Sequence, residues 1–144
     1  MYLLDTHVLS EIRKASRTKA ASPRIDLHVH RWLKGVSALD LYVSVVTFLE
    51  LERGYHLLKD RDEPQAELIR SWIRDRVLPG FNGRILPVDL PVVLRCAGIS
   101  PGKPIEYRDS LIAATALVHG MTVVTRNVRH FVASSATILN PWEA

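Results

Sequence analysis

Short apolar segments alternate with helical patterns along the chain, and this alternation restricts the possible folds more than any other feature. Segments typical of short buried strands lie at residues 2–4, 41–45, 84–88, 121–125 and 136–139. Apolar residues spaced three and four apart indicate helices at residues 8–14, 25–34, 48–58, 65–77, 90–97 and 111–118. Pro87 limits the 84–88 segment to an edge or very short strand. The order predicts an α/β fold, a three-layer α/β/α sandwich with a central parallel sheet.

Length and cysteine content narrow the class of protein. A chain of 144 residues has room for one domain. No apolar run approaches the length of about 18 residues that spans a bilayer, and the N-terminus does not resemble a signal peptide. The single cysteine, Cys96, excludes an internal disulfide and a cysteine-based zinc site. We therefore expect a cytoplasmic protein with no membrane association. The polar, basic stretch 14–23 is expected to be an exposed connection.

The charge balance is compatible with a polyanionic partner without requiring one. The formal net charge is +4, and 14 of the 19 basic residues are arginine. Arginine matches the geometry of phosphate oxygens well. A small basic excess on an ordinary soluble surface explains the same numbers.

Acidic residues follow two of the predicted strands and precede one predicted helix. Asp5 ends the first strand, Glu50 and Glu52 lie in the first turns of the helix after the second strand, and Asp109 stands just before the helix at 111–118. Taken singly, each is explained as a helix cap or as an early-helix acid favoured by the helix dipole. Ligands of parallel α/β sheets bind at the carboxyl ends of the strands, where these residues are expected to meet.

Carboxylates gathered at one edge of a sheet would repel one another, and burying them unpaired is unfavourable. A divalent cation removes that repulsion, and ligation by a few carboxylates suits Mg²⁺ or Mn²⁺. The chain has no glycine-rich phosphate loop and neither the G-x-S-x-G nor the H-E-x-x-H motif. His28 and His30, two residues apart on a helix, would face different directions, which argues against a histidine-based metal site.

Four ordered blocks resemble the PIN-domain family. They are MYLLDT at 1–6, VSVVTFLELERG at 43–54, RDSLIAATA at 108–116 and VVTRNVRHF at 123–131. The ending LNPW at 139–142 also fits, so that the resemblance covers the whole chain. The subgroup that it most resembles is the VapC/FitB-like toxins of bacterial toxin–antitoxin pairs.

The resemblance implies a single PIN domain over residues 1–144 and an endoribonuclease that depends on Mg²⁺, with Mn²⁺ as a substitute. It also implies a cognate antitoxin, an RNA substrate and a homodimer. Asp5, Glu50 and Asp109 match the metal ligands of the family, and the motif register favours Glu50 over Glu52. Thr6 and Thr125 match hydroxyl residues beside the site.

The chain departs from the family at the fourth acidic position. Many relatives have Asp where this chain has Asn127, and a nearby alternative acidic position holds His130. One-metal and two-metal sites therefore both stay open. Asn127 and Thr125 are expected to orient water or substrate, and Arg126 is expected at the RNA backbone. Attack by water that the metal activates would leave a 5′-phosphate and a 3′-hydroxyl.

Several alternatives remain from the residues alone. A PIN-fold module without catalysis would keep the same fold and bind a partner. A phosphatase-like enzyme with Asp5 as nucleophile usually needs a second Asp where this chain has His7, which is expected to cap the first helix rather than contact substrate. Leu51 and Trp72 would line a groove for the antitoxin, or they would pack in the core or in a dimer interface.

Overall fold

Five short strands form one parallel sheet in the computed structural model, which describes residues 1–15, 25–104 and 106–143. The strands are β1 (Tyr2–Leu4), β2 (Leu41–Ser44), β3 (Ile85–Leu86), β4 (Thr122–Val124) and β5 (Ile138–Leu139). Their order in the sheet is β3-β2-β1-β4-β5. The chain therefore starts in the centre, builds outward to β3, and returns to the other side of β1 to add β4 and β5. The direction of building reverses at β1, and such switch points are where open parallel sheets bind ligands.

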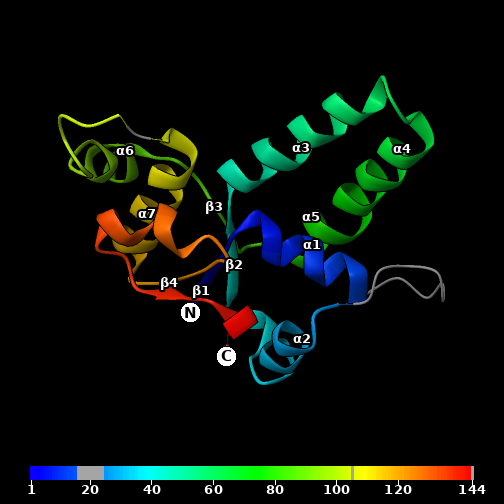
Figure 1. The fold of residues 1–144 in the computed structure, drawn as a ribbon, viewed down its shortest axis with the longest axis horizontal. Coiled ribbons are helices and arrows are strands. Elements are labelled where there is room, and N and C mark those ends of the chain that lie inside the picture. The colour runs from blue at the N-terminus through cyan, green and yellow to red at the C-terminus, as the bar shows by residue number, and fades with distance from the viewer. Residues whose placement is uncertain (16–24, 105, 144) are drawn as a thin grey trace.

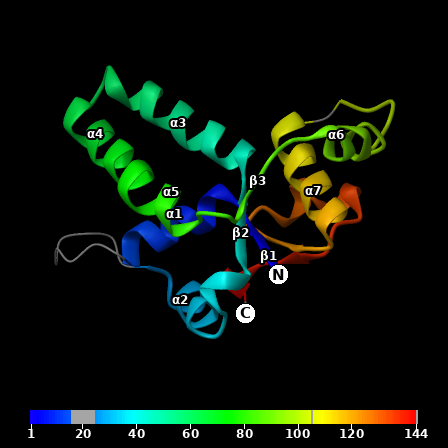
Figure 2. The ribbon, with the colours of Figure 1, turned by 180° about the vertical axis from the view of Figure 1, so that it is seen from behind.

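The helices cover both faces of this sheet. They are α1 (Thr6–Ala15), α2 (Leu27–Lys34), α3 (Val45–Lys59), α4 (Glu63–Trp72), α5 (Leu78–Gly80), α6 (Leu90–Ala97) and α7 (Tyr107–His119). Figures 1 and 2 show α6 and α7 on one side of the strands and α1, α3 and α4 on the other. The three-layer α/β/α architecture predicted from the sequence is thus confirmed. No helix in the described part of the chain is long and apolar enough to cross a membrane.

Successive strand residues point to opposite faces, and each face has its own core. Leu3 and Val123 pack with the buried side of α7, which includes Ile112. Leu4 and Val124 pack on the other face, against α1 and α3. The burial of these apolar side chains stabilises the helix layers on both faces of the sheet.

Several helices begin at other residues than their apolar patterns predict, because capping side chains set their starts. Ser44 caps α3, which begins at Val45, three residues before the expected helix at 48–58. Asp62 caps α4, which begins at Glu63, two residues before the expected helix at 65–77. The α-helix ends at Trp72, and the chain continues as a π-helix over Ile73–Val77. Ser and Asp accept hydrogen bonds from the free N–H groups of a first turn, whether or not apolar residues have begun there.

The two helices nearest the candidate site show the same effect. The last predicted helix begins at Tyr107 rather than at 111, with Glu106 as its N-cap. Asp109 therefore lies in the first turn of α7 and is not its cap, contrary to the simplest explanation for that residue. The helix ends at Gly120, which adopts a left-handed conformation with φ of 65°. The helix α1 begins at Thr6, which places His7 inside its first turn.

Strand predictions deviate by a residue or two. The 84–88 segment forms only Ile85–Leu86 and lies at an edge of the sheet, as Pro87 indicated. The expected connection at 14–23 begins inside α1 and otherwise lies outside the described residues.

Candidate active site

The acidic residues approach one another because three strands end, and one helix begins, at the same edge of the sheet. Asp5 follows β1, and Thr125 follows the neighbouring β4. The helix α3 starts directly after β2, which carries Glu50 into its second turn, and α7 presents Asp109 from its first turn. The carboxyl edge at the switch point therefore gathers residues from four distant parts of the sequence.

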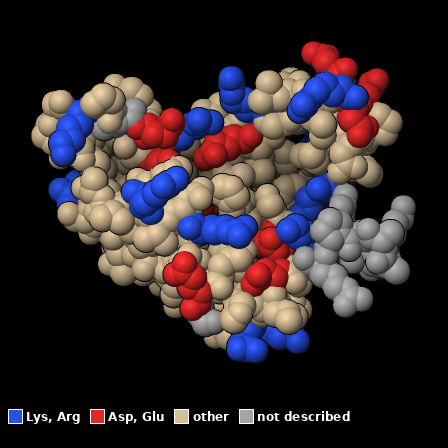
Figure 3. Space-filling model, in the orientation of Figure 1, with Lys and Arg blue, Asp and Glu red and all other residues tan. Residues whose placement is uncertain are grey.

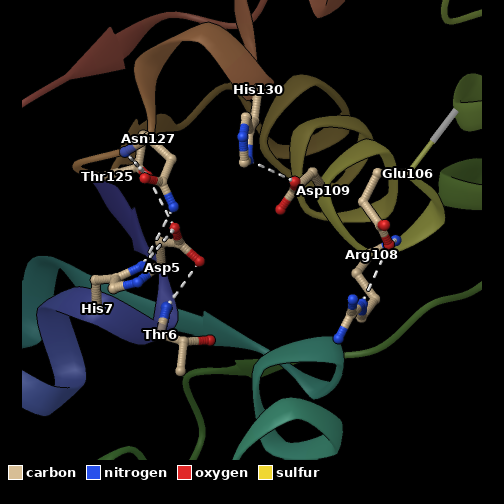
Figure 4. Close-up of polar contacts among 9 residues, drawn as sticks. All are labelled: Asp5, Thr6, His7, Glu106, Arg108, Asp109, Thr125, Asn127 and His130. Carbon is tan, nitrogen blue, oxygen red and sulfur yellow. Dashed lines mark hydrogen bonds and ion pairs between the residues drawn. The ribbon is translucent and has the colours of Figure 1, made fainter.

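These side chains line one cavity of about 210 Å³. Its walls are formed by Asp5, His7, Glu50, Glu106, Arg108, Asp109, Asn127 and His130. In Figure 4, His7 and Asn127 lie on one side of Asp5, and Asp109 and Arg108 lie on the other side. In the space-filling view, acidic and basic side chains stand next to one another where α3 and α7 face each other across the hollow (Figure 3). The predicted residues Asp5, Glu50, Asp109 and Asn127 are thus brought together.

Asp5 is the most enclosed of the three carboxylates, with 4% of its surface exposed. It accepts hydrogen bonds of 2.8 Å from the backbone N–H of Thr6 and from Thr125 Oγ1. The Nδ1 atom of His7 lies 3.8 Å from Asp5 Oδ2. Burial alone would raise the pKa of Asp5, but His7 and the two hydrogen bonds together hold it below its ordinary value. Asp5 is therefore ionised across the neutral range.

The pKa values of Glu50 and Asp109 are shifted in the direction opposite to that of Asp5. Burial and then the negative charge of Asp5 raise the pKa of both carboxyl groups. Glu50 Oε1 is buried and has no hydrogen-bond partner among the described residues. Asp109 Oδ2 lies 3.1 Å from His130 Nδ1 on the far wall. The cavity thus holds acidic groups whose charges disfavour one another, which is the condition that a bound cation relieves.

Within the described segments, no group of three or more His, Cys, Asp or Glu side chains already stands in an arrangement that could hold a metal ion. Two of the carboxylates are turned to other partners, Asp5 to Thr125 and Asp109 to His130. The donor set nevertheless fits Mg²⁺ or Mn²⁺, because it consists of carboxylate oxygens around a cavity large enough for a hydrated ion. Asp5, Glu50 and Asp109 are the carboxylates that would hold such an ion.

Glu52 lies outside this cavity. Its Oε2 atom is 3.9 Å from Arg70 Nη2, on the side of α3 that faces α4. Residues two apart on a helix are separated by about 200° around the axis. The structure therefore places Glu50, and not Glu52, among the cavity walls, in agreement with the register of the sequence motif.

The supporting residues occupy distinct positions. Thr125 Oγ1, fully buried, accepts from the Asn127 backbone N–H while it donates to Asp5. Thr6 Oγ1 is buried without a hydrogen-bond partner in the described structure. Arg126 is exposed, with its Cζ atom 5.6 Å from the centre of the Trp142 ring. Thr125 thus contacts the predicted metal ligand Asp5 through its side-chain hydroxyl, whereas Thr6 contacts Asp5 through its backbone N–H.

The sequence suggested that His7 caps the first helix, and this prediction is wrong. His7 sits within α1 and turns its ring into the cavity, where Nδ1 is 3.5 Å from Asn127 Nδ2. Helix α1 begins instead with the Asp5 backbone carbonyl, which accepts from Val8 N and Leu9 N. His7 is therefore a site residue.

Glu106 and Arg108 also line the cavity, although no role was predicted for either residue. Their position beside Asp109 could have indicated that they line the site, because the first turn of a helix that starts at a sheet edge faces that edge. The apolar pattern placed the helix start four residues too late, and this error hid the signal.

Leu51 and Trp72 belong to the packed interior in this structure. Leu51 is buried in the core between the sheet, α1 and α3, and Trp72 packs against the same cluster. Of the explanations for these residues, interior packing is the one that the structure supports.

The fold and this arrangement of acidic residues define a member of the PIN-domain family. The family described as PIN domain matches residues 2–133, and the chain belongs to it. The chain is 35% identical over 147 residues to Toxin FitB of Neisseria gonorrhoeae, with 99% of each chain covered. It is 34% identical over 148 residues to VapC ribonuclease Y4jK of Sinorhizobium fredii, again with 99% of each covered. The resemblance identified from the four sequence blocks is confirmed.

Solved structures of similar proteins have the same fold as this chain. The FitAcB crystal structure from Neisseria gonorrhoeae superposes with a TM-score of 0.84 at 36% identity, and each chain is fully covered. FitAB bound to an IR36 DNA fragment gives a TM-score of 0.81 at 36% identity, with 99% of this chain and 96% of the other covered.

Proposed function

We propose that this protein is a metal-dependent endoribonuclease and the toxin of a toxin–antitoxin pair. The observation that carries the proposal is the convergence of Asp5, Glu50 and Asp109 on one cavity at the switch point of a PIN fold. Full-length similarity to Toxin FitB and to a VapC ribonuclease supports both the activity and the biological role.

Asp5, Glu50 and Asp109 would hold Mg²⁺, or Mn²⁺ in its place. When bound, such an ion supplies positive charge that stabilises the developing charge on a phosphodiester and makes a nearby water more acidic. Burial, and after it the negative charge of Asp5, raises the pKa of Glu50 and Asp109, and a bound cation would offset the repulsion among these carboxylates.

The chain's own groups hold and orient the reactants. Thr125 fixes one oxygen of Asp5, and His7 and Thr125 together lower the pKa of this carboxyl group. The side-chain amide of Asn127, beside the His7 ring, orients water or a phosphate oxygen. Arg126 contacts the RNA backbone at the rim. Attack of water on phosphorus then breaks the bond to the 3′ oxygen, leaving a 3′-hydroxyl and a 5′-phosphate.

The partners follow from the relatives. The solved structures similar to this chain include a toxin–antitoxin complex from Klebsiella pneumoniae, which shares only the fold at 20% identity, and the FitAB complex at 36%. We infer that a cognate antitoxin binds this chain, that the chain forms a homodimer, and that it acts in the cytoplasm on RNA.

A direct test is incubation of purified protein with RNA in Mg²⁺, in Mn²⁺ and in a chelator, with analysis of product ends. We expect internal cleavage that needs a metal, and 5′-phosphate products. A PIN-fold module without catalysis would show neither cleavage nor stabilisation by metal. Products ending in a cyclic phosphate would contradict attack by water.

A further inference from the structure

Arg108 brings a permanent positive charge to the cavity walls. Among the described lining residues, it is the one arginine or lysine. Its side chain is about half exposed, so that it reaches the cavity from the solvent side. The other lining groups are carboxylates, histidines and Asn127. A guanidinium at the rim of an acidic cavity needs an explanation beyond stability, since an exposed ion pair contributes little.

The hydrogen bonds of Arg108 orient its guanidinium group. Its Nε donates to Glu106 Oε1 at 3.1 Å, and the same carboxylate oxygen accepts from the Arg108 backbone N–H at 3.4 Å. Both terminal Nη groups are left without a partner in the described structure. An arginine held at Nε presents its two Nη groups as a fork, which is the geometry that binds phosphate oxygens.

The fork lies on the α3 side of the cavity. Figure 4 shows the Arg108 guanidinium extending from the start of α7 toward α3, the helix that carries Glu50. Its charge lowers the pKa of Glu50, against the larger effect of burial. Among the described residues, Arg108 forms an ion pair with Glu106 and none with Glu50 within 4.0 Å. Arg108 is thus near a predicted metal ligand while its donors remain available.

A second arginine, Arg126, lies outside the cavity lining, next in sequence to the lining residue Asn127. Arg126 follows β4, and its charge acts on His7. Figure 4 places His7 and Asn127 on one side of Asp5 and Arg108 on the other, beyond Asp109. A strand of RNA that crosses the carboxylates would therefore pass Arg126 on one side and Arg108 on the other.

We propose that Arg108 binds the backbone phosphate next to the scissile one, on the α7 side of the cavity. This inference rests on the proposed function, since it gives the path of the substrate strand over the same site. A contact on each side of the carboxylates requires phosphates on both sides of the cut and so favours internal positions in RNA.

The test compares Arg108→Gln, Arg108→Lys and the control Arg76→Gln, an exposed arginine outside the cavity. The probe is a labelled single-stranded RNA of mixed sequence in Ca²⁺, after a check that the RNA stays intact. Fluorescence anisotropy gives its affinity across a salt series. We expect Arg108→Gln to weaken binding about tenfold, as for loss of a charged hydrogen bond, and to reduce the salt slope by about 0.7. Arg108→Lys should keep the slope but not the full affinity, and Arg76→Gln should change affinity less than about twofold.

A second measurement locates the phosphate. Once a cleavage site is mapped, single uncharged methylphosphonate linkages replace each neighbouring phosphate in turn. In the wild-type protein, one position beside the cut should weaken binding strongly. Arg108→Gln should be insensitive at that position alone, because the two changes remove the same contact.

The outcomes separate the two proposals. If the wild type neither binds nor cleaves RNA, the proposed function is wrong. If the wild type cleaves RNA while Arg108→Gln keeps its affinity and salt slope, only the role of Arg108 is wrong. Equal sensitivity of both proteins at every methylphosphonate position would overturn it as well.

Discussion

Thr125 Oγ1 donates a 2.8 Å hydrogen bond to Asp5 Oδ2, across a separation of 120 positions in the sequence. The same hydroxyl accepts from the Asn127 N–H at 3.0 Å, so that one buried oxygen joins the end of β1 to the loop after β4. β1 and β4 are hydrogen-bonded neighbours, which is why two residues so distant in sequence meet. The hydroxyl orients Asp5 and, after the larger effect of His7, helps to lower the pKa of this carboxyl group.

Thr125→Val should destabilise the metal-free protein by about 1–3 kcal/mol, because Asp5 and the Asn127 N–H each lose a buried partner. RNA cleavage should fall as well, since Asp5 is no longer held. Chemical denaturation and initial cleavage rates measure the two effects. Thr125→Ser keeps the hydroxyl and is the matched control. Equal stability of the Val variant and the wild type would mean that the hydrogen bond contributes nothing.

Metal ions should stabilise the wild-type fold. At a concentration about 100 times the Kd, an ion that binds only the folded state adds about 2.7 kcal/mol to the free energy of unfolding. For a chain of this size, Tm then rises by roughly 10 °C. Asp5→Asn should lose most of this response to Mn²⁺ and Mg²⁺. Calorimetry that finds the same metal affinity in both proteins would place the metal elsewhere.

Without metal, Asp109→Asn should be no less stable than the wild type at neutral pH. The raised pKa of Asp109 means that its charge is unfavourable in the folded state, and the substitution removes that charge. Glu106, and not Asp109, caps α7, so the cap survives. Asp5→Asn is the contrasting control, because the lowered pKa of Asp5 marks a favourable charge. A large loss of stability in Asp109→Asn would instead assign that residue a structural role.

Glu50→Gln should lower RNA cleavage more than about 100-fold, because loss of a metal ligand should exceed the effect of mutating a residue that only supports a ligand. It should also relieve toxicity in cells. Glu52→Gln should keep most of both properties, because Glu52 pairs with Arg70 outside the cavity. Cleavage assays and growth after induced expression provide the measurements. The reverse pattern would overturn the register of the site.

Metal binding should release protons at mildly acidic pH. Glu50 and Asp109 have raised pKa values, so that they hold protons at a pH where ordinary carboxyl groups are ionised. A metal ion displaces those protons, and its affinity therefore falls as the pH drops through the raised pKa values. Asp5, with a lowered pKa, adds nothing to this effect. Calorimetry in two buffers of different ionisation enthalpy counts the protons, and Glu50→Gln should release fewer. A count that does not change with pH would contradict the raised values.

In the metal-free protein the same shifts have a defined sign. Between the unfolded and the raised folded pKa of Glu50 and Asp109, the folded state binds more protons than the unfolded state. These two groups therefore make the free energy of unfolding decrease as pH rises through that window. Asp5 acts oppositely, since its contribution is present above the unfolded pKa and is lost as pH falls through the lowered folded value.

Much of the fold was predictable because its signals are local. The predicted segments 2–4 and 121–125 contain β1 and β4, which the structure places at Tyr2–Leu4 and Thr122–Val124. Helix starts were predicted less well. Apolar spacing does not contain the information that Ser44 and Glu106 supply as caps.

The sequence by itself determined the layers, the family and the candidacy of Asp5, Glu50 and Asp109, because periodicity and motif spacing are properties of neighbouring residues. Only the tertiary structure decided which side chains share the cavity. It turned His7 inward, brought Arg108 to the rim and buried Leu51. These outcomes depend on where α7 and α3 begin relative to the strand ends. That placement is set by the packing of residues far apart in the chain, which no local pattern specifies.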